Sequence, residues 1–288
     1  MSRPFLFNVV FWGEYHTKQL IDYTIPTLLS PNNIPSLVKV RDCEFLFVTT
    51  PQDAELLRGS ESFKLLSSLM PIQFCYVLFD NIDGSKYNKM TLGHTLVCQY
   101  GKDHKAYGIF LMPEMLIADG TLLYFDESVN NGSQAIVIMV LRLIEEELTY
   151  LRGPPIINIS KRDLVYILFR CAHPEIRSFM MDNDTISLSP GFLIWPDEEQ
   201  PVWIIHGIRG LPVLVDLENA VPEALGLTLD TGNFVGASIA DKNTIDVVTD
   251  SDQALICSIT PRDDVPTSLH LMTPTVENIT ILFMGQNI

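Results

Sequence analysis

Short apolar runs alternate with longer segments of helical periodicity through the first hundred residues, and this alternation most constrains the fold. Residues 5–11 form an apolar run interrupted only by Asn8, and the apolar residues of 15–29 recur close to helical spacing. The succession then repeats and ends in an apolar run around Ile109, with expected strands at 44–49 and 71–79 and expected helices at 61–69 and 87–100. Strands that alternate with helices form a largely parallel sheet. The sequence therefore predicts an α/β fold with a Rossmann-like, mostly parallel sheet flanked by helices.

The pattern changes after the Gly-Pro-Pro sequence at 153–155, which stiffens the backbone and removes hydrogen-bond donors. We expect residues 1–152 to form the α/β core and residues 153–288 to form a smaller α+β portion that completes a cleft. Local patterns predict helices at 122–129, 161–171 and 252–257, the last two capped by Ser160 and Asp250, a single buried strand at 135–142, and short strands at 203–208, 212–217 and 244–250.

Composition excludes several classes of function. The chain has 288 residues, 47% of them hydrophobic, and a net charge of −16, so it can bury a large core but lacks the clustered Lys and Arg that bind nucleic acid. Its five cysteines are scattered singly, which favours neither a zinc site nor a disulfide framework. The apolar start is interrupted by Asn8, Gly13 and Glu14 and is too short to span a bilayer. We expect no membrane span and a cytoplasmic location.

Acidic residues follow the apolar run of the segment 106–120, AYGIFLMPEMLIADG. Glu114 comes directly after the expected strand, and Asp119-Gly120 follows a second apolar step. Ligands of α/β proteins bind beyond the carboxyl ends of parallel strands. This segment is therefore the first place to look for a ligand site.

Three parts of the chain resemble bacterial glycosyltransferase-like proteins of the nucleotide-diphospho-sugar transferase (GT-A) superfamily. They are the run VVFWGEYHTKQLIDYTIPTLLSPNNIP at 9–35, PEMLIADGTL at 113–122, and the late segments TLDTG and DVVTDSD at 228–232 and 246–252. The resemblance implies a GT-A-like sheet with the nucleotide at the carboxyl edge of the first strands. It also implies Mn²⁺ or Mg²⁺ held by an Asp-x-Asp motif, but this chain has Pro113-Glu114-Met115 and then Asp119 at that position.

Candidate site residues follow from these positions, each with a structural alternative. Glu114 is the candidate metal or ribose contact, or else an exposed loop carboxylate. The candidates for the nucleotide side are Trp12, Gly13, Glu14, Asp80, Lys89 and Arg142, for which core packing, a turn, a polar loop or an internal ion pair are the alternatives. The catalytic candidates are Asp119, which could instead cap a helix, and Asp230, which could instead form a turn. In Asp250-Ser251-Asp252, a capping role is favoured over a metal site.

The function these features predict is transfer of a sugar from a nucleoside-diphosphate donor to an unknown glycan, lipid or protein acceptor. The alternative is a catalytically inactive GT-A-like protein that binds a nucleotide sugar or another protein. Both depend on one geometric expectation, that the carboxylates of 114 and 119 and the bend at Trp12 converge in one crevice. The histidines are isolated in sequence, and no GxSxG, P-loop, GxGxxG or HExxH pattern occurs.

Overall fold

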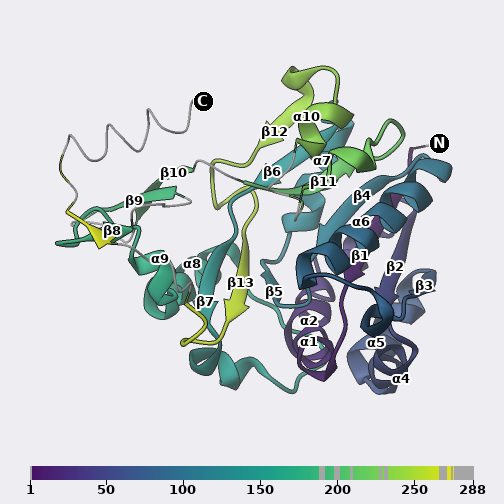
Figure 1. The fold of residues 1–288 in the computed structure, drawn as a ribbon, viewed down its shortest axis with the longest axis horizontal. Coiled ribbons are helices and arrows are strands. Elements are labelled where there is room, and N and C mark those ends of the chain that lie inside the picture. Colours follow the sequence, from purple (N-terminus) through teal and green to yellow (C-terminus); the bar gives the residue numbers. More distant parts are fainter. Residues whose placement is uncertain are drawn as a thin grey trace.

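The computed structural model describes residues 2–187, 192–197, 202–207, 210–226, 229, 233–265, 271–273 and 275. In this part of the chain the main feature is a seven-stranded sheet with the order β12-β6-β11-β4-β1-β2-β3 (Figure 1). Its strands are β1 (Phe5–Val10), β2 (Cys43–Thr49), β3 (Ile72–Tyr76), β4 (Tyr107–Leu111), β6 (Ala135–Ile138), β11 (Leu211–Asp216) and β12 (Ile245–Val247).

The sheet is mostly parallel, as predicted. β3, β2, β1 and β4 pair in parallel, and so do β6 and β12. β11 runs antiparallel to both of its neighbours, β6 and β4. The expected strands of the first hundred residues are confirmed, and so is the α/β class with helices flanking the sheet.

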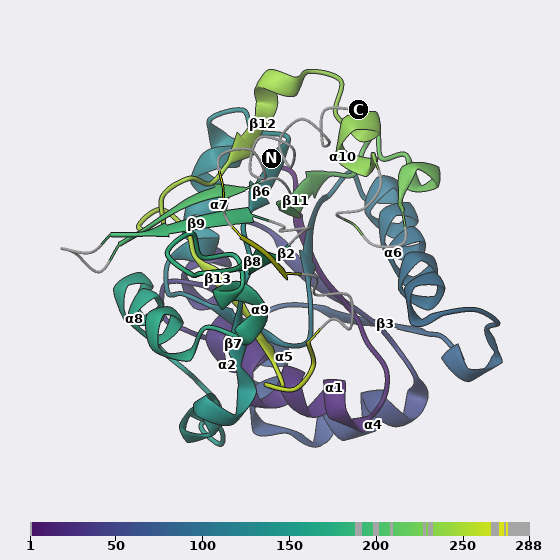
Figure 2. The same cartoon turned by 60° about the vertical axis from the view of Figure 1, so that its left-hand side comes forward.

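Helices cover both faces of the sheet. One face packs against helices from the first 130 residues, in a core that includes Phe7, Phe47, Leu28 and Phe125. The other face packs under α6 and α10, in a core that includes Val97 and Phe234, and α6 and α10 lie together on one side in Figure 2. The helices are α1 (Glu14–Gln19), the π-helix η1 (Leu20–Thr24), α2 (Ile25–Leu28), α3 (Ile34–Leu37), α4 (Pro51–Gly59), α5 (Glu61–Leu69), η2 (Phe79–Asn81), α6 (Lys86–Asp103), α7 (Thr121–Asn130) and α10 (Phe234–Ser238).

A second, three-stranded sheet has the order β5-β13-β7 and carries its own core with α8. β13 is antiparallel to β5 and parallel to β7. The other elements of the described chain are β5 (Met115–Ile117), β7 (Leu141–Ile144), η3 (Glu145–Leu151), α8 (Lys161–Cys171), α9 (Pro174–Arg177), β8 (Ile186–Ser187), β9 (Phe192–Pro196), β10 (Trp203–Gly207), β13 (Ile256–Thr260) and β14 (Leu271–Met272). Two short 3-10 helices belong to the main sheet's surroundings, η4 (Pro222–Ala224) against α6 and α10, and η5 (Lys242–Thr244) directly before β12. Among the described residues, no helix is both long and apolar enough to cross a bilayer.

Two local predictions were wrong. The single strand expected at 135–142 is two strands, because the chain leaves the main sheet after β6 and enters the second sheet as β7. The helix expected at 252–257 is a turn followed by β13, and Asp250 accepts a hydrogen bond from the backbone N–H of Asp252 at 2.8 Å within that turn. Apolar runs this short carry too little periodicity to distinguish these outcomes. The helices at 122–129 and 161–171, with the Ser160 cap, are confirmed.

The part after residue 153 contributes strands to both sheets, since β11 and β12 belong to the main sheet and β13 to the second. The division at 152/153 stays a prediction.

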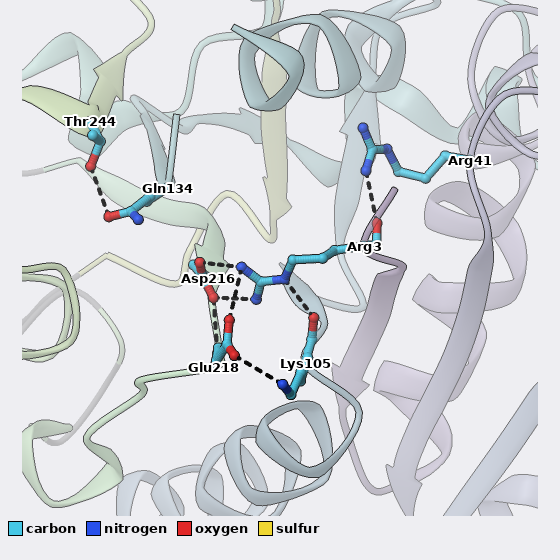
Figure 3. A network of polar contacts seen from close by, with 7 residues as sticks. All are labelled: Arg3, Arg41, Lys105, Gln134, Asp216, Glu218 and Thr244. Carbon is cyan, nitrogen blue, oxygen red and sulfur yellow. Dashed lines mark hydrogen bonds and ion pairs between the residues drawn. The ribbon is translucent and has the colours of Figure 1, made fainter. Parts of the chain in front are cut away.

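Charged side chains close the amino edge of the main sheet (Figure 3). Arg3 precedes β1 and donates from Nη1 to Asp216 Oδ2, at the end of β11, at 2.5 Å. Arg3 Nε donates to the carbonyl oxygen of Lys105 at 2.8 Å, and Lys105 Nζ lies 3.5 Å from Glu218. Each of these charged groups therefore has a partner within the protein. A ligand site is better sought at the opposite, carboxyl edge of the sheet.

Candidate functional site

The carboxyl edge of the main sheet gathers the segments that follow four parallel strands. β1 leads into Trp12 and Gly13, β2 into α4, β3 into η2, and β4 into Glu114. Neighbouring parallel strands end at the same edge, and this is where ligands of such sheets bind.

The buried carboxylate of Asp53 fixes the bend at Trp12 and Gly13 through hydrogen bonds. Gly13 has a φ of +86°, a conformation that glycine adopts without strain. Its N–H donates to Asp53 Oδ2 at 2.9 Å, and Asp53 also accepts from the hydroxyls of Thr17 at 3.1 Å and Thr50 at 2.6 Å. The N–H of Gly13 is therefore already used inside the protein and is not free to bind a phosphate.

Trp12 packs against Phe79, with ring centroids 4.5 Å apart and planes tilted by 31°. The indole is half-buried, so one part of it packs in the protein while the rest faces solvent. Asp80, the next residue of η2, is exposed. Trp12 and Asp80, both predicted for the nucleotide side, are thus close in the fold, because Trp12 contacts Phe79 and Asp80 is the next residue along the chain. Glu14 is exposed and pairs with Lys18 at 2.5 Å.

Glu114 has a buried carboxylate oxygen that accepts no hydrogen bond from the described residues. Its side chain is 25% accessible, but Oε2 is buried and has no hydrogen-bond partner among the described residues. Burial raises the pKa of Glu114 to about 7, against the opposing effects of a backbone hydrogen bond and of the charges of Arg142 and Lys86. His16 of α1 places Nδ1 3.9 Å from Glu114 Oε2. The segment after β4 therefore meets the helix that follows the Trp12 bend.

Two cations act electrostatically on this carboxylate, Lys86 and Arg142. Lys86 is the first residue of α6, and its charge acts on both Glu114 and His16. The pKa of His16 is lowered by burial and by Lys86, against an opposing effect of Asp53. Arg142 of β7 donates from Nη1 to Glu175 at 2.7 Å, so the internal ion pair considered for it is present. The predicted Lys89 is half-buried one turn further along α6.

Asp119 lies at the other end of β5 from Glu114. Its carboxylate accepts from the Ser30 hydroxyl at 2.5 Å and from the N–H and side-chain amide of Asn32 at 2.8 and 2.6 Å. Burial alone would raise the pKa of Asp119, but these hydrogen bonds outweigh it and the pKa is lowered. The strand between the two carboxylates, Met115–Ile117, spans about 10 Å. Glu114 and Asp119 thus lie at opposite ends of β5, and their expected convergence in one crevice stays a prediction.

A polar groove of about 620 Å³ borders the Asp119 end of β5. Its lining includes Gly120, Tyr124, Lys161, Asp246 and Asp252. Asp246 accepts from the Tyr124 hydroxyl at 2.8 Å, and Asp252 pairs with Arg162. The Asp-x-Asp at 250–252 thus contributes to a turn and an ion pair. Asp230 lies outside the described residues.

The site contains three residues that sequence reasoning missed, His16, Asp53 and Lys86. The Thr-Pro-Gln-Asp sequence at 50–53 is a recognisable helix start, since Thr50 accepts from the Asp53 N–H at 3.1 Å. His16 and Lys86 have no such signal, because their partners come from distant segments.

No protein-family model and no curated protein matches the chain. Solved structures similar to it include a Bacillus anthracis protein described as a glucose-1-phosphate thymidylyltransferase, in complex with sucrose, at 10% identity, 49% coverage of this chain, 55% of that chain and a TM-score of 0.32. Mouse xyloside xylosyltransferase 1 is 14% identical, with 48% and 53% coverage and a TM-score of 0.32. The 4-diphosphocytidyl-2C-methyl-D-erythritol synthase of Anaerococcus prevotii is 10% identical, with 99% coverage of both chains and a TM-score of 0.38.

The chain spans about half the length of the first two of these structures. The α/β class described above rests on the observed strand order and pairing.

Proposed function

We propose that the protein binds a nucleoside-diphosphate sugar at the carboxyl edge of its main sheet and transfers the sugar to a glycan, lipid or protein acceptor. The observation that carries the proposal is Glu114, whose buried Oε2 has no hydrogen-bond partner among the described residues and lies 3.9 Å from His16 Nδ1. The aromatic pair of Trp12 and Phe79 lies at the same edge of the sheet, after β1 and β3. A carboxylate, an aromatic surface and nearby cations are the groups that recognise a sugar, a base and a diphosphate. The sequence resemblance to GT-A proteins supports the same reading.

The residues take different roles in this proposal. Trp12 offers a flat face to the base, and Asp80 and Lys89 lie on the nucleotide side. Glu114 contacts the sugar or takes the proton of the acceptor hydroxyl, a role for which a pKa of about 7 is suited because it lies near the working pH. Asp119, at the other end of β5, stays a prediction as a catalytic residue, and Asp230 stays a prediction for the acceptor-side base.

A divalent cation does not fit the described residues. They contain no group of three or more His, Cys, Asp or Glu side chains able to hold a metal ion. Mn²⁺ and Mg²⁺ prefer several oxygen ligands, whereas Asp53, the other carboxylate that acts on His16, already accepts hydrogen bonds from Gly13, Thr17 and Thr50. The Mn²⁺ or Mg²⁺ implied by the GT-A resemblance stays a prediction, and no step is assigned to it.

A thermal-shift screen tests the proposal. UDP, GDP and their sugar conjugates are added with and without Mn²⁺ or Mg²⁺. A ligand at roughly 100 times its Kd stabilises the folded state by about 2.7 kcal/mol, which corresponds to a rise in Tm of about 5–10 °C. We expect a uridine or guanosine species to give this rise and Glu114→Ala to reduce the response to the sugar conjugate more than to the free diphosphate. If no nucleotide or nucleotide sugar changes the Tm, the proposed sugar-transfer function is rejected.

The second candidate function is a catalytically inactive protein that binds the nucleotide sugar. It is favoured by the occupied carboxylates near His16 and Tyr15 of α1, since Asp53 and Glu145 each accept several hydrogen bonds. Release of free diphosphate from the stabilising nucleotide sugar separates the two. Slow hydrolysis or transfer that Glu114→Gln abolishes supports the enzyme, and binding without release supports the second candidate.

A further inference from the structure

The carboxylates around Glu114 are already occupied by protein donors. Asp53 accepts from the Gly13 N–H and from the Thr17 and Thr50 hydroxyls. Glu145 accepts from the Tyr15 hydroxyl at 2.6 Å, from the Gln19 amide at 2.7 Å and from Arg152. Glu175 pairs with Arg142. A divalent cation at Glu114 would have to break one of these arrangements to gain a second carboxylate.

The charges nearest to Glu114 also oppose a second cation. Arg142 of β7 lies in register with Ser258 of β13, and Ser258 lies in register with Met115, the residue after Glu114. Lys86 begins α6 about two turns before Gly93, which packs on Val10 at the end of β1. Both charges favour the ionised form of Glu114, and His16 lies 3.9 Å from Oε2. A dication bound to Glu114 would be repelled by both side chains, and this repulsion is poorly screened where water is excluded. The same two side chains attract a diphosphate.

Lys86 is the better placed of the two to bind an anion. Lys86 is exposed at the start of α6 and has no ion-pair partner among the described residues. Its ammonium group lies 5.4 Å from the centre of the Tyr87 ring. Arg142 uses Nη1 for Glu175, and its Nη2 has no hydrogen bond in the described part of the chain. Arg142 can therefore donate to a second group without losing Glu175.

We propose that Lys86 and Arg142 bind the diphosphate of the ligand directly, in place of a divalent cation. This inference rests on the proposed function, because it concerns the same ligand at the same edge of the sheet. Lys86 supplies a mobile ammonium group and Arg142 a planar guanidinium, which suits two neighbouring phosphate groups.

Isothermal titration calorimetry with UDP and GDP tests the inference on the full chain. Titrations are run in EDTA and again with Mn²⁺, for wild type, Lys86→Ala, Arg142→Gln and Lys102→Ala. Lys102 is an exposed lysine in the last turn of α6 and serves as the matched control. Thermal melts of each variant verify that it is folded.

We expect one of the nucleotides to bind with the same Kd in EDTA and in Mn²⁺. Loss of a charged hydrogen bond corresponds to about a tenfold or greater weakening, so Lys86→Ala and Arg142→Gln should each raise Kd by that factor. Lys102→Ala should change Kd less than about twofold, and Lys86→Arg should recover most of the affinity.

Each other outcome overturns the inference in a recognisable way. Binding that needs Mn²⁺ rejects it and leaves the proposed function intact. Binding in EDTA that neither Lys86→Ala nor Arg142→Gln weakens places the diphosphate elsewhere. Absence of binding under both conditions, by folded protein, rejects the proposed function and this inference together.

Discussion

At the scale of single residues, a buried histidine makes stability depend on pH. His94 of α6 is 6% exposed, packs edge-on against Phe110, and has no hydrogen-bond partner for Nδ1 among the described residues. Burial lowers the pKa of His94 to about 4, from the ordinary histidine value of 6.5. Between these values the unfolded chain binds a proton that the folded protein does not, so stability is lost as pH falls through this window. We expect a loss of about 3 kcal/mol from this residue between pH 7 and pH 4.

Urea unfolding at a series of pH values checks this expectation, with His94→Gln as the comparison. The variant should lose less stability than wild type between pH 6.5 and 4, because glutamine does not titrate there. Equal slopes for the two proteins would show that His94 is protonated in the folded state. The sequence predicted the helix here but could not predict this pKa, because the burial of His94 depends on Phe110 of β4, from another part of the chain.

At the scale of elements, the π-helix η1 fixes the strand that follows Glu114. Thr24 ends η1, and its hydroxyl accepts from the Met115 N–H at 2.8 Å and donates to the Pro113 carbonyl at 2.7 Å. Thr24→Val removes both bonds and leaves a buried N–H without an acceptor, which costs about 1–3 kcal/mol. Thr24→Ser keeps the hydroxyl and should cost less than about 1 kcal/mol, mainly for the lost methyl group.

Chemical denaturation of both variants measures this difference, and a Val variant as stable as the Ser variant would contradict it. The helical periodicity of 15–29 predicted a helix in this place, and the structure has one interrupted by the π-helix. Sequence alone could not show the contact, since Thr24 and Met115 are 91 residues apart. The same limit applies to the candidate site. The strand ends indicated Glu114 and Trp12, whose roles stay predictions, whereas the donors to Asp119 come from the loop at 30–32, which no sequence pattern linked to Asp119.

At the scale of the whole molecule, β11 joins the two parts of the chain. It lies between β6 and β4 and pairs with both, although it comes from residues 211–216. The periodic pattern predicted parallel strands but could not predict their order, which depends on contacts between distant segments. We expect the fragment 1–152 to show no cooperative unfolding transition, because β4 and β6 would each lose a partner. Circular dichroism on heating measures this, and a sharp transition in the fragment would establish residues 1–152 as an independent domain.

The position of β11 also has a consequence for synthesis. The ribosome releases β1, β2, β3, β4 and β6 long before residue 216 has left the exit tunnel, so the nascent chain holds a sheet with two unpaired inner edges for the time needed to add some eighty residues. Open strand edges are sites of aggregation. A chaperone that shields such edges would therefore act on this protein late in translation, between completion of β6 and arrival of β11.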